Sequence, residues 1–241
     1  MRSSYRVFIL LLIFSVLSVK PLVAKQKVDR LHMHAKVYLK NDSVVEGYVQ
    51  NSHPNLITPL FILYTYEPCA NDKSIYISQS WKFLAKQKKY SIENINCMVT
   101  WYDEEPEAHS LWVPEQGNFA YGNDEPIELK HPSMMKLVFK GRHVEGFYCF
   151  YTGLGSGDQI LYKTAQMEKA KALFSPKGFR LTVRRETLLE EFSDYPEMQE
   201  FIQGLKRKDL KANPLLILEK FDEVLDRLGA LEQMTVETSC K

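Results

Sequence analysis

The chain has 241 residues, of which 45% are hydrophobic and 25% are charged, and its formal net charge is +1. This balance is typical of a folded globular protein and excludes disorder over most of the length. A nearly neutral chain has no general electrostatic attraction to nucleic acid, so we expect no nucleic-acid partner.

The first 24 residues have the layout of a secretory signal peptide. Arg2 and Arg6 precede an apolar run at residues 7–19, and a short Leu-Val-Ala stretch ends at Ala24. The run is shorter than the roughly 20 residues that a membrane-spanning helix needs. We therefore predict cleavage after Ala24 and a periplasmic or secreted mature protein without a stable membrane span. Cleavage removes three basic residues and no acidic one, so the formal charge falls from +1 to −2.

A hairpin in residues 37–49 is the clearest strand signal. Valine, tyrosine and leucine flank a polar turn at residues 40–43, and these types suit a half-buried pleated surface. Gly47 lies inside the second strand, where glycine usually marks a bulge, a bend or a close backbone approach. Residues 137–147 echo this pattern with a shorter turn, so Gly47 and Gly146 are predicted bend or bulge positions. Chance likeness between two hairpins with the same bend at the glycine is preferred over a true repeat as the explanation of the echo.

Strand-like runs continue along a body that we place at residues 35–183. They occupy residues 60–66, 74–84, 90–102, 134–151, 159–163 and 179–183. The glycine-rich residues 153–158 join two such runs, so they favour a hairpin turn over a phosphate-binding loop. Four prolines and several acids predict a long loop at 103–132, anchored by Trp112. Residues 166–174 favour a short helical turn.

The spacing of the hydrophobic residues becomes helical from residue 184. We expect two or three helices in residues 184–229, each with an apolar stripe that packs on the body. Asp194 is a predicted N-cap and Gly229 the predicted end of the last helix, followed by a flexible tail at 230–241. The expected fold class is α+β. Its β-rich body, barrel-like or a two-part antiparallel sheet, precedes a small C-terminal helical segment.

We assign no catalytic, cofactor-binding or metal-binding residue from the sequence, and we expect no cofactor. His32 and His34 would face the same way on a strand, but no third metal ligand lies near them in sequence, so a solvated strand is preferred. The acids at 103–107 favour a solvated loop over a calcium site. Glu46 and Glu145 are expected to point to solvent, since buried carboxylates need partners.

Cysteines and aromatic residues leave more than one interpretation open. The cysteines are Cys69, Cys97, Cys149 and Cys240. In an oxidising compartment they allow three full disulfide pairings, buried thiols are equally compatible, and we expect no catalytic thiol. The prominent aromatic residues are Tyr64, Tyr66, Trp81, Trp101, Tyr102, Trp112, Phe119, Tyr121, Tyr148 and Tyr151. If these side chains were exposed, they would bind sugars or peptides. The preferred interpretation is that they fill the core of a β-rich domain.

Two resemblances extend this interpretation. One set of residues resembles the beginning and middle of Sm-like or SH3-like small barrels: Val37, Leu39, Lys40, Asn41, Gly47, Ile92, Ile95 and Val99. The second RNA-binding motif of that family is absent, so this resemblance implies barrel geometry only. The whole layout, with the phrase FSDYPE at residues 192–197, resembles uncharacterised exported proteins common in Bacteroidetes. That resemblance implies a Gram-negative periplasm and brings no activity or site residues.

The sequence leaves three functions open. We expect a non-catalytic periplasmic binding or interaction protein whose partner is an unknown envelope protein or glycan, because catalytic motifs are lacking and aromatic residues are plentiful. The first alternative is a hydrolase of glycans or peptides, with carboxylates that the fold assembles. The second alternative is a metal-handling protein that uses His32 and His34.

Overall fold

The computed structural model describes most of the chain after its first 32 residues. The described ranges are 33–50, 53–58, 61–65, 68–80, 86–103, 105–121, 124–128, 130–151, 157–174 and 181–239. They all belong to one unit that begins at His32. The predicted signal peptide and the His32 side chain lie outside the described residues.

Strands dominate the described residues. Their bounds are β1 (Met33–Leu39), β2 (Val44–Val49), β3 (His53–Thr58), β4 (Phe61–Thr65), β5 (Ser74–Ser78), β6 (Gln87–Ser91), β7 (Ile95–Tyr102), β8 (Glu105–Glu115), β9 (Gly117–Tyr121), β10 (Asp124–Glu128), β11 (Ser133–Lys140), β12 (Val144–Tyr151), β13 (Gly157–Thr164) and β14 (Ala170–Phe174). A short 3₁₀ turn, η2 (Ile92–Asn94), joins β6 to β7. The helices are α2 (Leu181–Glu191), α3 (Pro196–Gly204), α4 (Arg207–Ala212) and α5 (Leu216–Ser239).

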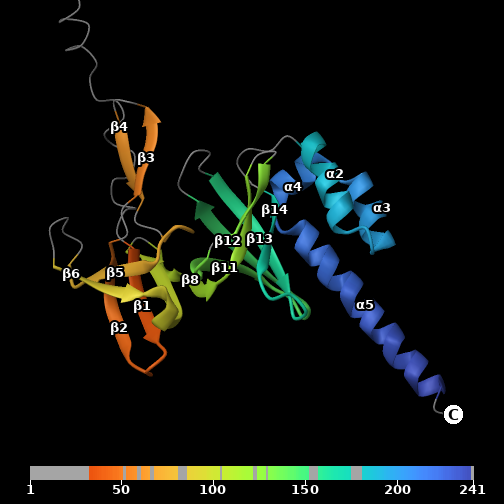
Figure 1. Cartoon of the computed structure of the whole chain (residues 1–241), viewed down its shortest axis with the longest axis horizontal. Helices are drawn as coiled ribbons and strands as arrows, with labels where there is room; N and C mark the ends of the chain where they lie inside the picture. Colours follow the sequence, from red (N-terminus) through yellow and green to blue (C-terminus); the bar gives the residue numbers. More distant parts are fainter. Residues whose placement is uncertain are drawn as a thin grey trace, which may run out of the picture. The chain divides into compact units, whose positions relative to one another are not determined.

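Twelve of these strands form one sheet, whereas β3 and β4 pair with each other in a separate hairpin. The strand order of the large sheet is β10-β9-β14-β13-β12-β11-β8-β7-β1-β2-β5-β6. Its described pairs are antiparallel, apart from the parallel pair of β14 with β9. Figure 1 shows the helices beside β12, β13 and β14. The fold is α+β, with a β-rich body and a short helical C-terminal segment, which confirms the predicted fold class.

The two echoing hairpins lie in different halves of the sheet. β1 and β2 lie between β7 and β5, and β11 and β12 lie between β8 and β13. One face of the N-terminal half packs a core that contains Met33, Ala35, Val37, Val49, Ile75, Ile77, Ile92, Ile95, Met98, Trp112 and Met134. Alternation along β1 places every second residue in this core, as a half-buried strand requires.

The C-terminal half of the sheet is covered on both faces. On one face, Val144 and Tyr162 pack against the helices, where Phe192 and Phe221 meet at 4.8 Å between ring centroids. The other face has its own core, formed by Ala70, Phe119, Met135, Phe147, Cys149, Leu161 and Ala170. Because these strands are buried on both faces, their sequences are nearly continuous apolar runs.

Residues 103–132 do not form the long loop that we predicted. They contain β8, β9 and β10, which all join the large sheet. Trp112 is buried and donates its indole N–H to Thr100 Oγ1 at 2.8 Å, so it anchors a strand. We predicted a loop because proline usually interrupts a strand, but Pro106 and Pro114 lie within β8. A strand tolerates proline where the missing N–H would have no partner. Whether a partner is missing depends on the pairing with distant residues.

Two short assignments between residues 166 and 183 are also wrong. Ala170–Phe174 is strand β14, with Ala170 and Leu173 buried, where we predicted a helical turn. Helix α2 begins at Leu181, inside the predicted last strand at 179–183. Short apolar segments fit both the strand and the helix period, so neighbouring elements decide between them.

The helical segment differs from the prediction in its boundaries. The described residues hold four helices, where two or three were expected. The N-cap of α3 is Tyr195, without a side-chain cap bond, and is not Asp194. Helix α5 passes through Gly229 and extends into the predicted tail at 230–241. A single interior glycine costs a helix only about 1 kcal/mol, so it does not end a long one.

The two hairpin glycines have different surroundings. The register of β1 with β2 is unbroken, so no bulge occurs at Gly47. The register of β11 with β12 shifts between Leu137 and Phe139, and Gly146 pairs with Phe139 at this point. The extra residue is Val138 of β11, so the irregularity lies opposite Gly146, in the partner strand and not at the glycine itself.

Candidate binding surface

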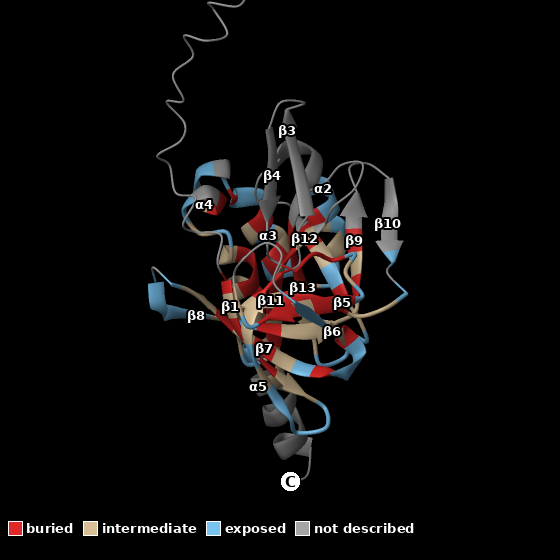
Figure 2. Cartoon of the chain, turned by 90° about the vertical axis from the view of Figure 1, so that its left-hand side faces the viewer, coloured by how far each residue is buried: buried red, intermediate tan, exposed pale blue. Residues whose placement is uncertain are grey.

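The face of the N-terminal half opposite its core is turned to solvent. Strands β2, β1, β7 and β8 are consecutive in the sheet, and their residues alternate between the core and this second face. We call this second face the outer face. It is formed by Val44, Glu46, Tyr48, His34, Lys36, Tyr38, Cys97, Val99, Trp101, His109 and Leu111. Figure 2 shows the exposed first part of β8, which becomes buried further along the strand.

Four rings form a row across the outer face. His34 pairs with Tyr48 on β2 and with Trp101 on β7. The His34 ring centroid lies 4.1 Å from that of Tyr48 and 5.3 Å from that of Trp101, and the planes of His34 and Trp101 differ by only 4°. Trp101 then meets His109 of β8 edge-on, at 5.6 Å. Strand pairing therefore aligns four rings from four strands, which we call the ring row.

The outer face also exposes aliphatic side chains. Val44 is 49% exposed and Leu111 is 37% exposed. Within the described residues the third exposed large hydrophobic side chain is Leu228, which belongs to helix α5. Val44 pairs with Tyr38, and Leu111 pairs with Val99. Exposed apolar side chains on a solvent-facing surface that also carries aromatic rings are typical of an interaction site.

Acidic residues border the ring row. Asp103, directly after β7, is half exposed and bonds His34 Nε2 through its carboxylate. Glu105 and Glu107 are exposed at the beginning of β8. These three acids are therefore solvated as predicted, but they lie at the end of one strand and the beginning of the next, and Glu104 lies outside the described residues. This arrangement gives the outer face a negative border.

The metal hypothesis gains no support from the described geometry. The described residues contain no group of three or more His, Cys, Asp or Glu side chains that would hold a metal ion. His34 already contacts Asp103 and the rings of Tyr48 and Trp101. The predicted pairing of His34 with His32 is untested, because His32 lies outside the described residues.

Glu46 and Glu145 do not form a pair of catalytic carboxylates. Glu46 is exposed on β2, and Glu145 lies on β12, where its Oε1 is 3.7 Å from Lys140 Nζ. Four strands separate β2 from β12 in the sheet. The two acids are therefore far from each other, in keeping with the expected solvent-facing roles.

The described thiols are in environments that disfavour the nucleophilic thiolate. Burial raises the pKa of Cys97. Burial also raises the pKa of Cys149, and the charge of Asp72 adds to this effect against a weaker opposing bond to the Phe150 carbonyl. A thiol that stays protonated is a poor nucleophile, so these two cysteines favour structural roles. The pairing of Cys69, which is buried, and of Cys240, which lies outside the described residues, stays open.

The aromatic residues divide between core and surface. Trp112 and Phe119 fill the core, as the preferred interpretation predicts, whereas Trp101, Tyr102 and Tyr148 are half-buried. The side chains of Tyr64, Tyr66, Trp81, Tyr121 and Tyr151 lie outside the described residues. Sequence reasoning missed two members of the ring row, Tyr48 and His109, and considered His34 only as a possible metal ligand. Their strands are far apart in the chain, and only the pairing register brings them together.

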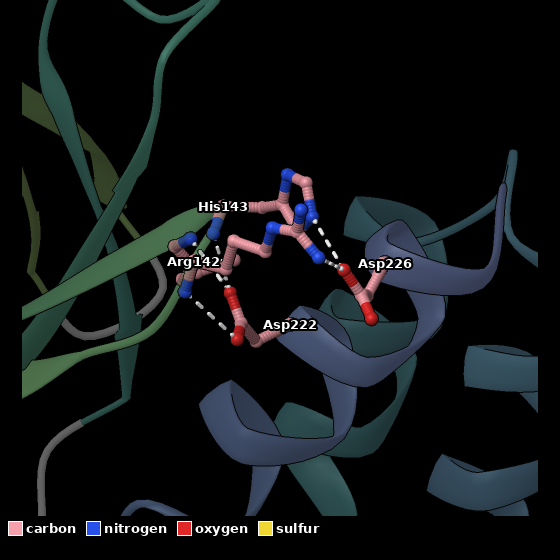
Figure 3. A network of polar contacts seen from close by, with 5 residues as sticks. Arg142, His143, Asp222 and Asp226 are labelled. Atoms are coloured by element: carbon pink, nitrogen blue, oxygen red, sulfur yellow. Dashed lines mark hydrogen bonds and ion pairs between the residues drawn. The ribbon is translucent and has the colours of Figure 1, made fainter. Parts of the chain in front are cut away.

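A second polar cluster joins helix α5 to the turn between β11 and β12 (Figure 3). The Asp222 carboxylate accepts the backbone N–H groups of Arg142, His143 and Val144 at 2.7 to 3.0 Å. Asp226 accepts the Arg142 guanidinium at 2.8 Å and contacts the His143 ring at 3.2 Å. Both carboxylates are engaged by the turn, so we interpret this group as a docking cluster that holds the helix to the sheet.

Comparisons with known proteins add no family. No protein-family model, curated protein or solved structure matches the chain. The resemblances to small barrels and to exported Bacteroidetes proteins therefore stay predictions. In the described part of the chain, no helix combines the length and apolar character that crossing a membrane requires.

Proposed function

We propose that this protein is periplasmic or secreted and binds another envelope protein through its outer face, without catalysing a reaction. The observation that carries the proposal is the combination of the ring row with the exposed Val44 and Leu111 on one face. Aromatic residues at the centre of a patch with a charged border are typical of protein interfaces.

The orientation of the rings favours a protein over a glycan as the partner at this face. A sugar stacks on the open face of an aromatic ring. Here the His34 ring lies between those of Tyr48 and Trp101, and the far side of Trp101 meets His109. Neighbouring rings therefore flank His34 and Trp101, which leaves less open ring area for a sugar to stack on. The exposed valine and leucine on the same face suit the irregular apolar surface of a protein better than a flat sugar ring.

Export is supported by the N-terminal pattern of basic residues, apolar run and small residue. The test is N-terminal sequencing of the mature protein from a fractionated culture of its host. A periplasmic or secreted form that begins at Lys25 would support the proposal. A form that keeps residues 1–24 in the cytoplasmic fraction would contradict it.

Binding is tested by site-specific photo-crosslinking in the native envelope. A photoreactive residue replaces Val44 or Leu111, and a matched control replaces Leu228, which is similarly exposed on α5. We expect one discrete adduct from positions 44 and 111, absent from position 228. Trp101→Ala should reduce its yield by about tenfold or more, since aromatic anchors dominate interface energies. Equal adducts from position 228, or none from the outer face, would overturn the proposal.

A further inference from the structure

The turn of the first hairpin and strand β6 enclose a polar hollow. Its volume is about 450 Å³, which is within the range of small-molecule sites, and it is open to solvent on one side. The lining includes Lys40, Asn41, Lys89, Tyr90, Ser91 and Asn94. This hollow is separate from the ring row, because the residues that line it belong to the last position of β1, the turn, β6 and η2.

Backbone contacts hold the walls of the hollow in place. The backbone N–H of Lys40 bonds the Asn94 carbonyl at 2.9 Å, which ties the turn to η2. The Asn41 side-chain oxygen accepts both the backbone N–H and the hydroxyl of Ser43, at 3.2 and 2.7 Å. The amide oxygen of Asn41 is thus engaged within the turn, and its NH₂ donors have no partner in the described structure. Hydrogen bonds therefore hold the walls of the hollow in place, and the Asn41 NH₂ group remains able to donate to a ligand.

The two lysines of the hollow have no carboxylate partner among the described residues. Neither Lys40 nor Lys89 forms an ion pair with any described residue, and Lys88 on the same strand lies over the Tyr90 ring at 5.3 Å. The acids nearest in sequence, Asp42 and Glu93, do not line the hollow. An unpaired ammonium group attracts an oxyanion, and lysine is a common point-charge binder of phosphate.

A second hollow differs from the first in how its charged residues are paired. It lies beside the turn between β11 and β12 and has a similar volume, but its lining mixes cations with acids. Each of its strongly basic residues already contacts a carboxylate. These contacts are Lys140 with Glu145 at 3.7 Å, Arg142 with Asp226 at 2.8 Å and Lys163 with Glu115 at 2.9 Å. Of these two hollows, the first therefore combines space with uncompensated positive charge, whereas the second does not.

We infer that the hollow between the first hairpin turn and β6 binds a sugar that carries a phosphate or sulfate ester. Lys40 and Lys89 hold the tetrahedral oxyanion, and the Asn41 amide donates hydrogen bonds to it. Leu39 and Tyr90 provide apolar wall for the sugar ring, and the volume exceeds the needs of an inorganic anion. This inference is independent of the proposed protein-binding function, because the two surfaces share no residue.

Calorimetric titration of the full mature chain tests the inference with four probes: glucose 6-phosphate, glucose 6-sulfate, glucose and inorganic phosphate. At millimolar concentrations we expect binding of at least one ester and none of glucose. Inorganic phosphate should bind at least fivefold more weakly than the phosphate ester. Binding should also weaken as sodium chloride is raised, because the contacts are exposed and electrostatic. The two ester arms distinguish a phosphate source from a sulfate source.

Variants separate this site from general surface charge. Lys40→Gln and Lys89→Gln should each weaken ester binding by about fivefold, and the double variant should abolish it. Lys208→Gln is the matched control, because Lys208 is an exposed lysine on α4. All these side chains are exposed, so unchanged thermal unfolding is expected throughout. Trp101→Ala should bind the ester normally, which keeps this result distinct from the outer face. Wild-type affinity in the double variant, no binding of either ester, or equal affinity for inorganic phosphate would overturn the assignment.

Discussion

Gly146 of β12 lies directly against Leu218 of helix α5. A β-carbon at position 146 would overlap Leu218 Cδ1 and would also approach the Phe139 β-carbon to 2.9 Å. Leu218 is itself fully buried in the core between sheet and helices. The glycine therefore lets the last helix approach the sheet closely at the bulge.

Gly146→Ala should lower the free energy of unfolding by about 1–3 kcal/mol, because an extra methyl group overpacks the contact with α5. The measurement is urea denaturation followed by circular dichroism. Gly204→Ala is the control, since no atom lies within 4 Å of the position that its β-carbon would take. That control should be neutral or slightly stabilising. Equal stability of the Gly146 variant and wild type would show that the helix shifts at no cost.

Gly47→Val should destabilise the protein by about 1 kcal/mol or more, through close backbone approach instead of a bulge. A β-carbon at position 47 would overlap the Ser78 carbonyl oxygen on β5 and would lie 2.8 Å from Ile77 Cγ2. A carbonyl within a strand cannot move aside as a flexible side chain can. The midpoint of thermal unfolding measures the effect, with Gly229→Ala, at a position in open space, for comparison. An unchanged midpoint would mean that β2 and β5 can move apart to fit the side chain at no measurable cost in stability.

Asp222→Ala should weaken the docking of α5 by about 1 kcal/mol, because three backbone N–H groups of the turn lose their acceptor. Guanidinium denaturation at pH 7 provides the measurement. Glu223→Ala is the matched control on the same helix, since that residue makes only an exposed contact with Lys220. A loss of equal size in both variants would contradict a docking role for Asp222.

The same carboxylate predicts an acid dependence of stability. Burial acts to raise the pKa of Asp222, but the backbone N–H groups and the charge of His143 outweigh it and hold that pKa below its ordinary value of 3.8. A carboxyl group with a lowered pKa stabilises the fold above its ordinary value and loses this contribution as the pH falls through the folded-state pKa. The difference in stability between wild type and Asp222→Asn should therefore shrink below about pH 4. A constant difference down to pH 2 would refute this linkage.

Thr100→Val should cost about 1–3 kcal/mol, because the buried indole N–H of Trp112 would lose its acceptor. The shape of the side chain is preserved, so the loss reports the hydrogen bond. In a double-mutant cycle, adding Trp112→Phe removes the donor, and the Thr100 substitution should then cost clearly less. Urea unfolding of the four proteins gives the coupling energy. Additive losses would mean that the bond contributes nothing.

Local patterns were sufficient for several features of this fold. Alternation around a polar turn predicted the hairpin of β1 and β2, and glycine-rich residues 153–158 predicted the hairpin of β12 and β13, which do pair antiparallel. The helical period predicted the C-terminal segment, and the α+β class followed from the two periods together. These features depend on residues within a few positions of one another, where side-chain direction follows directly from backbone period.

Long-range pairing decided the rest. The sequence around Pro106 and Pro114 resembles a loop, and it becomes β8 only because β7 and β11 lie on either side. The ring row likewise needs His34, Trp101 and His109 to meet through the register of separate strands. Helix α5 docks because its Asp222 accepts hydrogen bonds from the turn between β11 and β12, and these contacts join residues about 80 positions apart. Such contacts leave no periodic signal in a single sequence, because the partners are set by the sheet order and not by neighbours in the chain.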